Sequence, residues 1–377
     1  MTAFIGVMSG TSLDGIDVVV VEFDSEDKFK LEAAQTYPYD AELRASLLRL
    51  IEHQQCSLTE LGQLDMALGQ ASADAILKLL RQHNMIPEHI NAIGSHGQTI
   101  CHAPDVRLPF SMQIGNPSLI AEKTGITTVS DFRARDMVVG GQGAPLVPAF
   151  HQALFNSDSE NRVILNIGGI SNITVLSKEK NSQAVAFDTG PGNVLMDAWI
   201  QRSTGADYDD SGNWAAQGHA NEQLLAWFME DSYFSRPAPK STGRERFNSR
   251  WLNTKLDKYQ SVRTLSAVDT QTTLARLTAV SIVNDIKKYA PETDAVYVCG
   301  GGAHNHNLLN LLKELLGANI KLASTEVLGL SPDWVEACAF AWLARQTMLQ
   351  RPGNLPSATG ALKTCILGGI YLSSQAS

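Results

Sequence analysis

Two carboxylates and several hydroxyls gather in a glycine-containing turn near the start of the chain. Residues 6–17 read Gly-Val-Met-Ser-Gly-Thr-Ser-Leu-Asp-Gly-Ile-Asp, with apolar runs at 4–8 and 16–23 on either side of the turn. This pattern predicts a strand, a tight turn and a second strand. Small residues, backbone N–H groups and hydroxyls suit a bound phosphate. Asp14 and Asp17 would repel one, so we expect a divalent cation between these carboxylates and the phosphate.

The turn differs from a Walker loop, which places a lysine on the phosphates and opens a helix. Here the turn has no lysine, and a strand-like segment follows it. It is similar instead to the first phosphate-binding hairpin of the actin, sugar-kinase and heat-shock ATPase superfamily. An ordinary β-hairpin turn is the structural alternative.

The second half of the chain repeats this design. A predicted strand at 162–166 leads through a Gly/Ser turn at 167–171 into a second strand at 172–177 and a third at 184–187. Residue identity between the halves is slight, so the repeat is one of architecture. We expect two related lobes that close on a nucleotide between them. Elsewhere short strands alternate with amphipathic helices at 41–53, 58–82 and 117–124, which indicates an α/β class.

Composition narrows the classes of protein that fit. A chain of 377 residues favours two domains. The formal net charge is −9 and there is no run of Lys and Arg, so we expect no nucleic-acid partner. The five cysteines are scattered, which argues for reduced thiols rather than a disulfide framework or zinc site. Without a secretory signal or a membrane-length apolar run, the expected location is the cytoplasm, with no membrane partner.

Asp188 is the candidate for acid–base chemistry. It follows the predicted strand at 184–187 and precedes Gly-Pro-Gly, where α/β sheets display functional side chains. Phosphoryl transfer needs a group that orients and deprotonates the nucleophile, so we expect Asp188 to be a general base. A buried capping aspartate is the structural alternative.

Glycines at 300–302 lie between a predicted strand and a predicted helix, and permit close approach of a flat ligand or phosphate. A tight packing turn would explain them equally well. Farther along, Asp269 is expected to cap a helix that reaches Tyr289.

Polar side chains with sugar-binding chemistry follow other short strands. Amides, carboxylates and guanidinium groups bind sugars, and an arginine also suits a substrate carboxylate. His96 and Glu336 have structural alternatives, as a buried histidine and as a helix-terminal charge. Lys240 and Arg244, in the polar loop 237–248, could face a phosphate or solvent. The candidate substrate residues are His96, Gln98, Thr99, Asp131, Arg133 and Glu336.

The Gly-Gly-Gln-Gly-Ala-Pro segment at 140–145 is the strongest flexible break in the first half, so we expect a hinge near it. The predicted first lobe is 1–135 with the tail 360–377, and the predicted second lobe is 136–359.

Together these motifs resemble the anhydro-N-acetylmuramic acid kinase family of the actin-like ATPase superfamily over essentially the whole length. The resemblance is carried by segments 6–17, 95–99 (Ser-His-Gly-Gln-Thr), 140–146, 165–172, 187–193 (Phe-Asp-Thr-Gly-Pro-Gly-Asn), 239–245, 299–305 and 356–361.

The resemblance implies two actin-like (ribonuclease H-like) lobes with an interdomain nucleotide cleft, and a cytoplasmic homodimer. It implies ATP and Mg²⁺ as cofactors and 1,6-anhydro-N-acetylmuramic acid plus water as substrates. The product would be N-acetylmuramate 6-phosphate, in peptidoglycan recycling. A kinase for another small sugar or carboxylic acid, or a non-enzymatic actin-like ATPase, are the alternatives.

The resemblance also assigns roles to residues. Asp188 would activate the water, and Asp14 and Asp17 would lie near the metal. The residues expected at the nucleotide are Gly10, Thr11, Ser12, Leu13, Asp14, Gly15, Ile16, Asp17, Gly168, Gly169, Gly190, Gly300, Gly301, Gly302 and Asn305.

Overall fold

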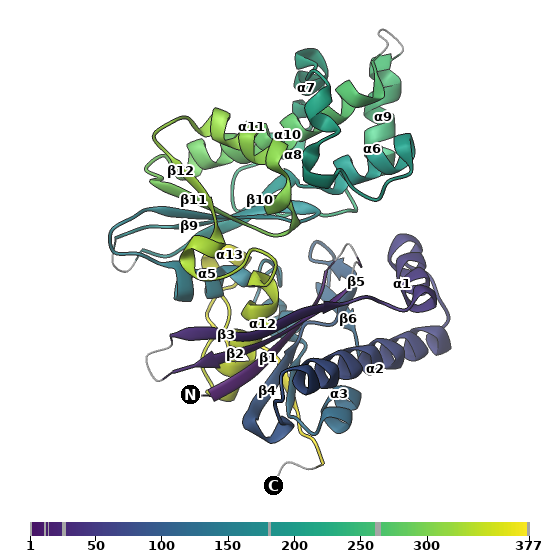
Figure 1. The fold of residues 1–377 in the computed structure, drawn as a ribbon, viewed down its shortest axis with the longest axis vertical. Helices are drawn as coiled ribbons and strands as arrows, with labels where there is room; N and C mark the ends of the chain where they lie inside the picture. Colours follow the sequence, from purple (N-terminus) through teal and green to yellow (C-terminus); the bar gives the residue numbers. More distant parts are fainter. Residues whose placement is uncertain are drawn as a thin grey trace. The chain divides into compact units, whose positions relative to one another are not determined.

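A computed structural model describes residues 2–10, 13, 15–24, 28–179, 182–260 and 265–374 of the chain. They fall into two compact units: unit 1 comprises Met1–Phe150 and Trp334–Ser377, and unit 2 comprises His151–Asp333 (Figure 1).

Unit 1 is built on one mixed sheet with the strand order β13-β7-β4-β1-β2-β3. The first three strands along the chain are antiparallel neighbours, and β4 and β7 continue the sheet in parallel with β1. Their bounds are β1 Thr2–Ser9, β2 Ile16–Phe23, β3 Phe29–Tyr37, β4 Ile90–Ser95, β7 Thr128–Ser130 and β13 Gly369–Tyr371. A separate hairpin consists of β5 Gln98–Ala103 and β6 Phe110–Ile114.

Helices flank this sheet, and several follow directly from leucine and alanine spacing. The bounds are α1 Ala41–His53, α2 Leu58–Gln82, η1 Pro87–His89, α3 Pro117–Thr124, α4 Phe132–Val138, α5 Val147–Phe155, α12 Val335–Met348 and α13 Pro356–Thr359. The boundary between the units falls inside α5. Residues of α2 on one face, including Leu64, Leu68 and Ile76, are buried in the core of unit 1.

Two glycines let α12 rest directly on the sheet. A Cβ at Gly6 of β1 would lie 1.8 Å from the carbonyl oxygen of Ala337, and one at Gly94 of β4 would lie 2.0 Å from that of Phe340. Any larger residue would push the helix away from the strands. This packing makes α12 part of unit 1.

Unit 2 repeats the sheet of unit 1. Its strand order is β10-β9-β8-β11-β12, with β8, β9 and β10 antiparallel and β11 and β12 parallel to β8. The bounds are β8 Arg162–Ile167, β9 Ile170–Leu176, β10 Val185–Pro191, β11 Ala295–Cys299 and β12 Lys321–Ser324. Three antiparallel strands followed by two parallel ones thus occur in both units. The predicted α/β class with two actin-like lobes is confirmed.

The long helix α10 Ala267–Tyr289 is the centre of the core of unit 2, with more than half of its residues buried. The other helices are α6 Val194–Thr204, η2 Asp210–Gly212, η3 Ala215–Gln217, α7 Glu222–Met229, α8 Ser232–Ser235, α9 Ser249–Gln260, η4 Gly301–His304, α11 His306–Leu316 and η5 Thr325–Leu328. No helix among the described residues is both long and apolar enough to span a bilayer.

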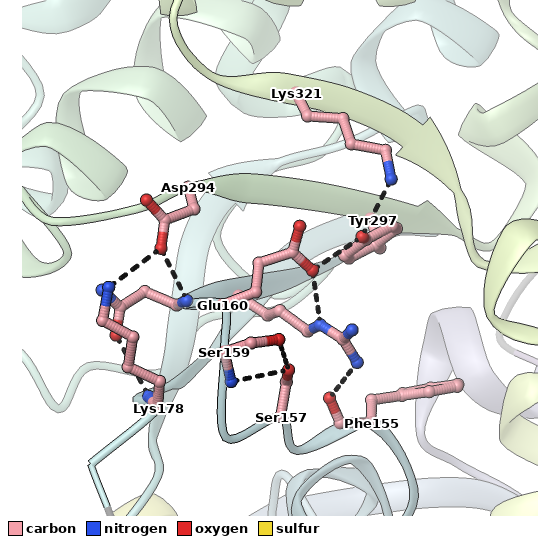
Figure 2. Close-up of polar contacts among 10 residues, drawn as sticks. Phe155, Ser157, Ser159, Glu160, Lys178, Asp294, Tyr297 and Lys321 are labelled. Atoms are coloured by element: carbon pink, nitrogen blue, oxygen red, sulfur yellow. Dashed lines mark hydrogen bonds and ion pairs between the residues drawn. The ribbon is translucent and has the colours of Figure 1, made fainter.

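A polar network at the N-terminal end of β8 connects this strand to its neighbours in unit 2 (Figure 2). Glu160 accepts hydrogen bonds from Arg162 Nε at 2.7 Å and from the Tyr297 hydroxyl at 2.8 Å. Lys321 Nζ donates to the same hydroxyl at 3.2 Å. The network therefore links the N-terminal end of β8 to β11 and β12. The glycine turn follows the opposite, C-terminal end of β8.

The divisions between the units differ from those expected from sequence, which were 135/136 and 359/360. The glycine-rich segment 140–143 lies inside unit 1, where Gly143 N donates to Asp136 Oδ2 at 2.9 Å and Gln142 N donates to Thr359 O at 2.8 Å. These bonds fix the segment, and the chain crosses later, within α5. It returns at Trp334, because α12 packs on β1 and β4.

Two local expectations also change. Ser266, not Asp269, caps α10, and the Asp269 carboxylate accepts instead from His219 N at 2.7 Å. Strand β10 does not end at Phe187 but continues through Asp188 to Pro191.

Candidate active site

The first predicted phosphate turn joins β1 to β2 in unit 1. Leu13 N donates to Gly10 O at 3.2 Å, and Leu13 has a positive φ of 55°, which is unfavourable for a branched side chain. The side chains of Leu13 and Ile16 are buried in the core of unit 1. Only their backbone could therefore face a ligand. Three of the residues predicted at this turn, Thr11, Ser12 and Asp14, lie outside the described residues.

Asp17 lies at the start of β2, and its Oδ1 accepts a hydrogen bond from the Thr36 hydroxyl at 2.6 Å. Gly15 packs against β3, since a Cβ there would lie 2.5 Å from Thr36 Cγ2. Among the described residues no group of three or more His, Cys, Asp and Glu side chains could hold a metal. The carboxylate oxygens of Asp17 suit Mg²⁺, but phosphate oxygens and water would have to complete the ligands.

Gln98 is joined to the end of β1. The Ser9 hydroxyl contacts both Gln98 Oε1 and the Tyr39 hydroxyl. Burial raises the pKa of Tyr39 to about 12, so this phenol is protonated at neutral pH. Because Ser9 immediately precedes Gly10, the structure brings a predicted sugar residue next to the predicted phosphate turn.

Three further predicted substrate residues lie together in unit 1. His96 Nε2 accepts from Arg133 Nε at 3.1 Å and contacts Arg133 Nη2 at 2.8 Å, while Arg133 Nη1 donates to Gly143 O at 2.7 Å. Burial lowers the pKa of Arg133 to about 10, opposed by the charge of Glu336 in the first turn of α12. The arginine is therefore still a cation at neutral pH, with Glu336 as a charged neighbour.

Asp131 and Thr99 occupy different surroundings. Asp131 is exposed as a whole residue and has a positive φ of 59° at the start of α4. Nearby protein atoms still remove part of the water around its carboxyl, and this desolvation raises its pKa. Thr99 lies on β5, where its hydroxyl accepts from Gln113 Nε2 at 3.0 Å.

The same hairpin holds polar residues that sequence reasoning missed. Gln113 Nε2 also donates to the Ser111 hydroxyl at 2.7 Å, and Ser111 contacts His102 Nδ1 at 3.0 Å. Burial and the charge of Arg133 lower the pKa of His102 to about 4. These residues belong to no recognisable motif, and only their alternation along paired strands could have indicated a shared face.

Asp188 lies in edge strand β10 of unit 2, beside a register shift between Asp188 and Gly190. Such a bulge re-aims a side chain. Its Oδ2 accepts from the Ser241 hydroxyl at 3.1 Å and from Thr242 N at 2.9 Å. Burial raises the pKa of Asp188 to about 6, although these donors oppose the shift. A carboxyl with this pKa can exchange a proton near neutral pH.

Lys240 does not face a phosphate or solvent. Its side chain is 3% exposed and its Nζ pairs with Asp285 Oδ2 at 2.8 Å. The sequence offered no signal for this pair, because the two residues lie on a loop and on α10, far apart in the chain.

The second glycine turn, between β8 and β9, is tied to the segment after Asp188. Gly192 N donates to Gly169 O at 2.9 Å, and Asn193 N donates to Gly168 O at 2.9 Å. This brings the turn and the Gly-Pro-Gly segment side by side within unit 2.

The predicted nucleotide glycines of unit 2 separate into two kinds. Gly190 and Gly300 have positive φ values of 143° and 77°, and a Cβ at Gly302 would lie 2.3 Å from the Ile167 side chain, so the fold itself requires these glycines. At Gly168 and Gly301 a Cβ would meet nothing closer than 3.6 and 3.9 Å. Packing gives no reason for glycine at these two positions, whereas close approach of a ligand does. Asn305 caps α11 by accepting from Leu308 N at 2.9 Å.

Comparisons with known proteins agree on one family. A family model described as anhydro-N-acetylmuramic acid kinase matches residues 2–373. A protein of that name from Coxiella burnetii is 48% identical over 368 residues, which cover 98% of this chain and 97% of the relative. One from Pasteurella multocida is 48% identical, with 98% and 96% covered, and one from Photobacterium profundum is 48% identical, with 98% of each covered.

Among solved structures, component A of the (R)-2-hydroxyglutaryl-CoA dehydratase of Acidaminococcus fermentans aligns with a TM-score of 0.48 and 11% identity, covering 90% of this chain and 96% of that one. A ROK family glucokinase from Streptomyces griseus, in complex with glucose and AMPPNP, aligns with a TM-score of 0.40 and 14% identity, covering 91% and 99%.

Proposed function

The chain belongs to the anhydro-N-acetylmuramic acid kinase family, and we propose that Asp188 is the base with which it opens the anhydro sugar. As a member of this family it is a phosphotransferase with an alcohol group as acceptor. It converts 1,6-anhydro-N-acetylmuramic acid, water and ATP into N-acetylmuramate 6-phosphate and ADP, in the recycling of peptidoglycan.

The observation that carries the role of Asp188 is the unequal use of its two carboxylate oxygens. Oδ2 accepts two hydrogen bonds, and Oδ1 accepts none from the described residues. In the proposed step, a water oxygen bonds to the anomeric carbon as one water proton moves to Oδ1. The bond between that carbon and O6 breaks, and O6 takes the γ-phosphoryl group from ATP. The pKa of about 6 leaves most of the carboxylate ionised at neutral pH.

For the sugar, we propose that Arg133 binds the substrate carboxylate. Its guanidinium is a partly buried cation held in a fixed orientation by His96 and Gly143. Planar guanidinium groups match carboxylates in geometry and charge. Gln98, Thr99, Asp131 and Glu336 are proposed as further sugar contacts.

For the nucleotide, we propose phosphate contacts from Gly10, Gly168 and Gly169, and close approach of ATP at Gly301. We propose that Asp17, with Asp14, holds Mg²⁺. The metal would neutralise phosphate charge, a role that no lysine in the turn supplies. Because the resemblance to the family implies it, a cytoplasmic homodimer is part of the proposal. No disulfide joins the cysteines among the described residues, which fits a reducing compartment.

The test is a coupled ADP-release assay with anhydro-N-acetylmuramic acid, run on the parent, Asp188→Asn, and Asp257→Asn as an exposed control on α9. We expect kcat of Asp188→Asn to fall by roughly a hundredfold or more, the scale of general base catalysis, with ATP binding retained. The control should match the parent. A parent-like rate in Asp188→Asn would refute the role of the base.

Heavy-oxygen water separates ring opening by water from simple deprotonation of a sugar hydroxyl. We expect one label on the anomeric carbon and none in the phosphate ester bridge, when the product is trapped by reduction before it exchanges. An unlabelled trapped product would exclude water activation. ADP release independent of sugar would instead favour a non-enzymatic actin-like ATPase, and release with another sugar or acid would identify a different kinase.

A further inference from the structure

We propose that the buried ion pair between Lys240 and Asp285 is a positioning device for Asp188. It anchors the loop segment 240–242, which supplies the donors to one carboxylate oxygen of Asp188. This inference rests on the proposed role of Asp188 as the base, and adds two residues that act through it.

The ion pair is almost fully buried. Lys240 Nζ lies 2.8 Å from Asp285 Oδ2, and the side chains of the two residues are 3% and 8% exposed. Nζ also lies 5.0 Å from the ring centroid of Tyr233 and 6.0 Å from that of Phe187. Asp285 belongs to α10, the helix at the centre of the unit 2 core. The ion pair therefore fastens the loop to a helix that is itself held in the core of unit 2.

The loop contacts Asp188 through Lys240 and the two residues that follow it. Lys240 O accepts from Asp188 N at 3.0 Å, while the Ser241 hydroxyl and Thr242 N donate to Asp188 Oδ2. Tyr233, whose ring faces Lys240 Nζ, donates its hydroxyl to Asp188 O at 2.6 Å. One lysine thus connects the backbone and the carboxylate of Asp188 to α10.

Stability alone is a weak reason for such a pair. Removing two charges from water costs free energy that their attraction only partly returns, so apolar replacements are often neutral or stabilising. The segment 237–243 has no helix or strand of its own to hold it. An ion pair forms only when Lys240 meets Asp285 in a narrow range of positions, so it fixes where the loop lies against Asp188. An apolar side chain can pack in several positions and would fix the loop less strictly.

The ionisable groups around Asp188 determine what loss of the pair should do. Lys240 and the two donors favour the ionised carboxylate, whereas burial and the negative charge of Glu245 oppose it. Removing Lys240 and loosening its loop should therefore raise the pKa of Asp188 further. The charged and titratable groups packed around this site are Lys240, Glu245, Tyr233, Asp285, Arg236, Arg246 and Lys288.

The experiment uses the double variant Lys240→Met/Asp285→Leu, which leaves no unpaired buried charge. We expect a folded protein whose kcat at pH 7 falls about tenfold or more, and whose acid limb moves up by about one pH unit. The KM for ATP should stay within twofold of the parent. Lys255→Met is the matched control, since Lys255 donates to Trp227 O at 3.0 Å and lies over that ring in the same unit, away from Asp188.

The outcomes separate this inference from the proposed function. If Asp188→Asn turns over at the parent rate, the base assignment itself fails. If Asp188→Asn is inactive but the double variant keeps the parent acid limb and kcat per folded molecule, only the positioning role fails. Should the double variant not fold, Lys240→Met is measured in the same way, because without Lys240 burial raises the pKa of Asp285 and favours its neutral form. An unshifted limb with the parent kcat in a folded Lys240→Met would then overturn the inference.

Discussion

His96 Nε2 is the hydrogen-bond acceptor that orients Arg133, whose Nε and Nη2 lie 3.1 and 2.8 Å from it. Arginine has donors only, so the imidazole must carry its proton on Nδ1. Burial and the charge of Arg133 hold the pKa of His96 well below 6.5. His96 therefore remains neutral and keeps its acceptor throughout the physiological pH range.

Replacing this acceptor should weaken sugar binding and spare the nucleotide. His96→Phe keeps an aromatic ring against Phe340, whose centroid lies 4.7 Å from that of His96, but removes the partner of the guanidinium. A hydrogen bond to a charged group is worth about 1.5–3 kcal/mol, so we expect KM for the sugar to rise roughly 10- to 100-fold. Steady-state kinetics with each substrate varied measure this. His53→Phe, at an exposed position of α1, is the control, and an unchanged sugar KM in His96→Phe would contradict the role.

The pH profile of kcat should have an acid limb near the pKa of Asp188. Burial raises that pKa from the usual 3.8 to about 6, and the base works only when ionised, so kcat should fall as pH drops through about 6. A limb near pH 4, after correction for unfolded protein, would mean that an unburied carboxyl acts instead.

The raised pKa of Asp188 should also make the free energy of unfolding depend on pH. The pKa is higher in the folded state, so its contribution to stability is fully present below about 3.8 and is lost as pH rises through about 6. Asp188→Asn has no carboxyl to ionise at this position, so it does not lose this stability as pH rises. Its unfolding free energy relative to the parent should therefore increase between pH 4.5 and pH 7.5, as measured by denaturant titration at both values. A constant difference would show that the folded and unfolded pKa values are alike.

Local pattern predicted much of this fold. The apolar spacing that indicated a helix at 58–82 matches α2, and Ser57 caps it by accepting from Glu60 N at 3.1 Å. The valine-rich run at 16–23 matches β2. In both elements, side-chain period and terminal residues agree with the final packing, which is why sequence alone sufficed.

Contacts between distant segments were beyond such reasoning. Nothing near Gly6 or Gly94 indicates that α12 will lie against them, so the return of the chain to unit 1 was placed too late. The partner of Lys240 is 45 residues away on α10. The bulge beside Asp188 likewise arises from pairing with β9, and has no local signature.

Metal dependence tests the role of Asp17. Excess chelator should abolish turnover, because the turn has no lysine of its own and the metal is expected to offset the phosphate charge. Asp17→Asn should raise the Mg²⁺ concentration for half-maximal activity by about tenfold, while Asp74→Asn, on an exposed position of α2, should not change it. Full activity in excess chelator would remove the metal from the mechanism.

Two adjacent glycines allow ligand contact to be distinguished from packing. A Cβ at Gly301 would meet only Asn193 Nδ2 at 3.9 Å, whereas one at Gly302 would overlap the Ile167 side chain at 2.3 Å. Gly301→Ala should therefore leave the unfolding free energy within about 0.5 kcal/mol of the parent. It should raise the KM for ATP about tenfold or more, because its methyl group would occupy space that we propose for the nucleotide. Gly302→Ala should lose about 1–3 kcal/mol of stability through overpacking. Denaturant titrations and ATP kinetics on both variants provide the comparison. If Gly301→Ala binds ATP like the parent, the nucleotide does not approach this turn, and the glycine is there for a reason other than the ligand.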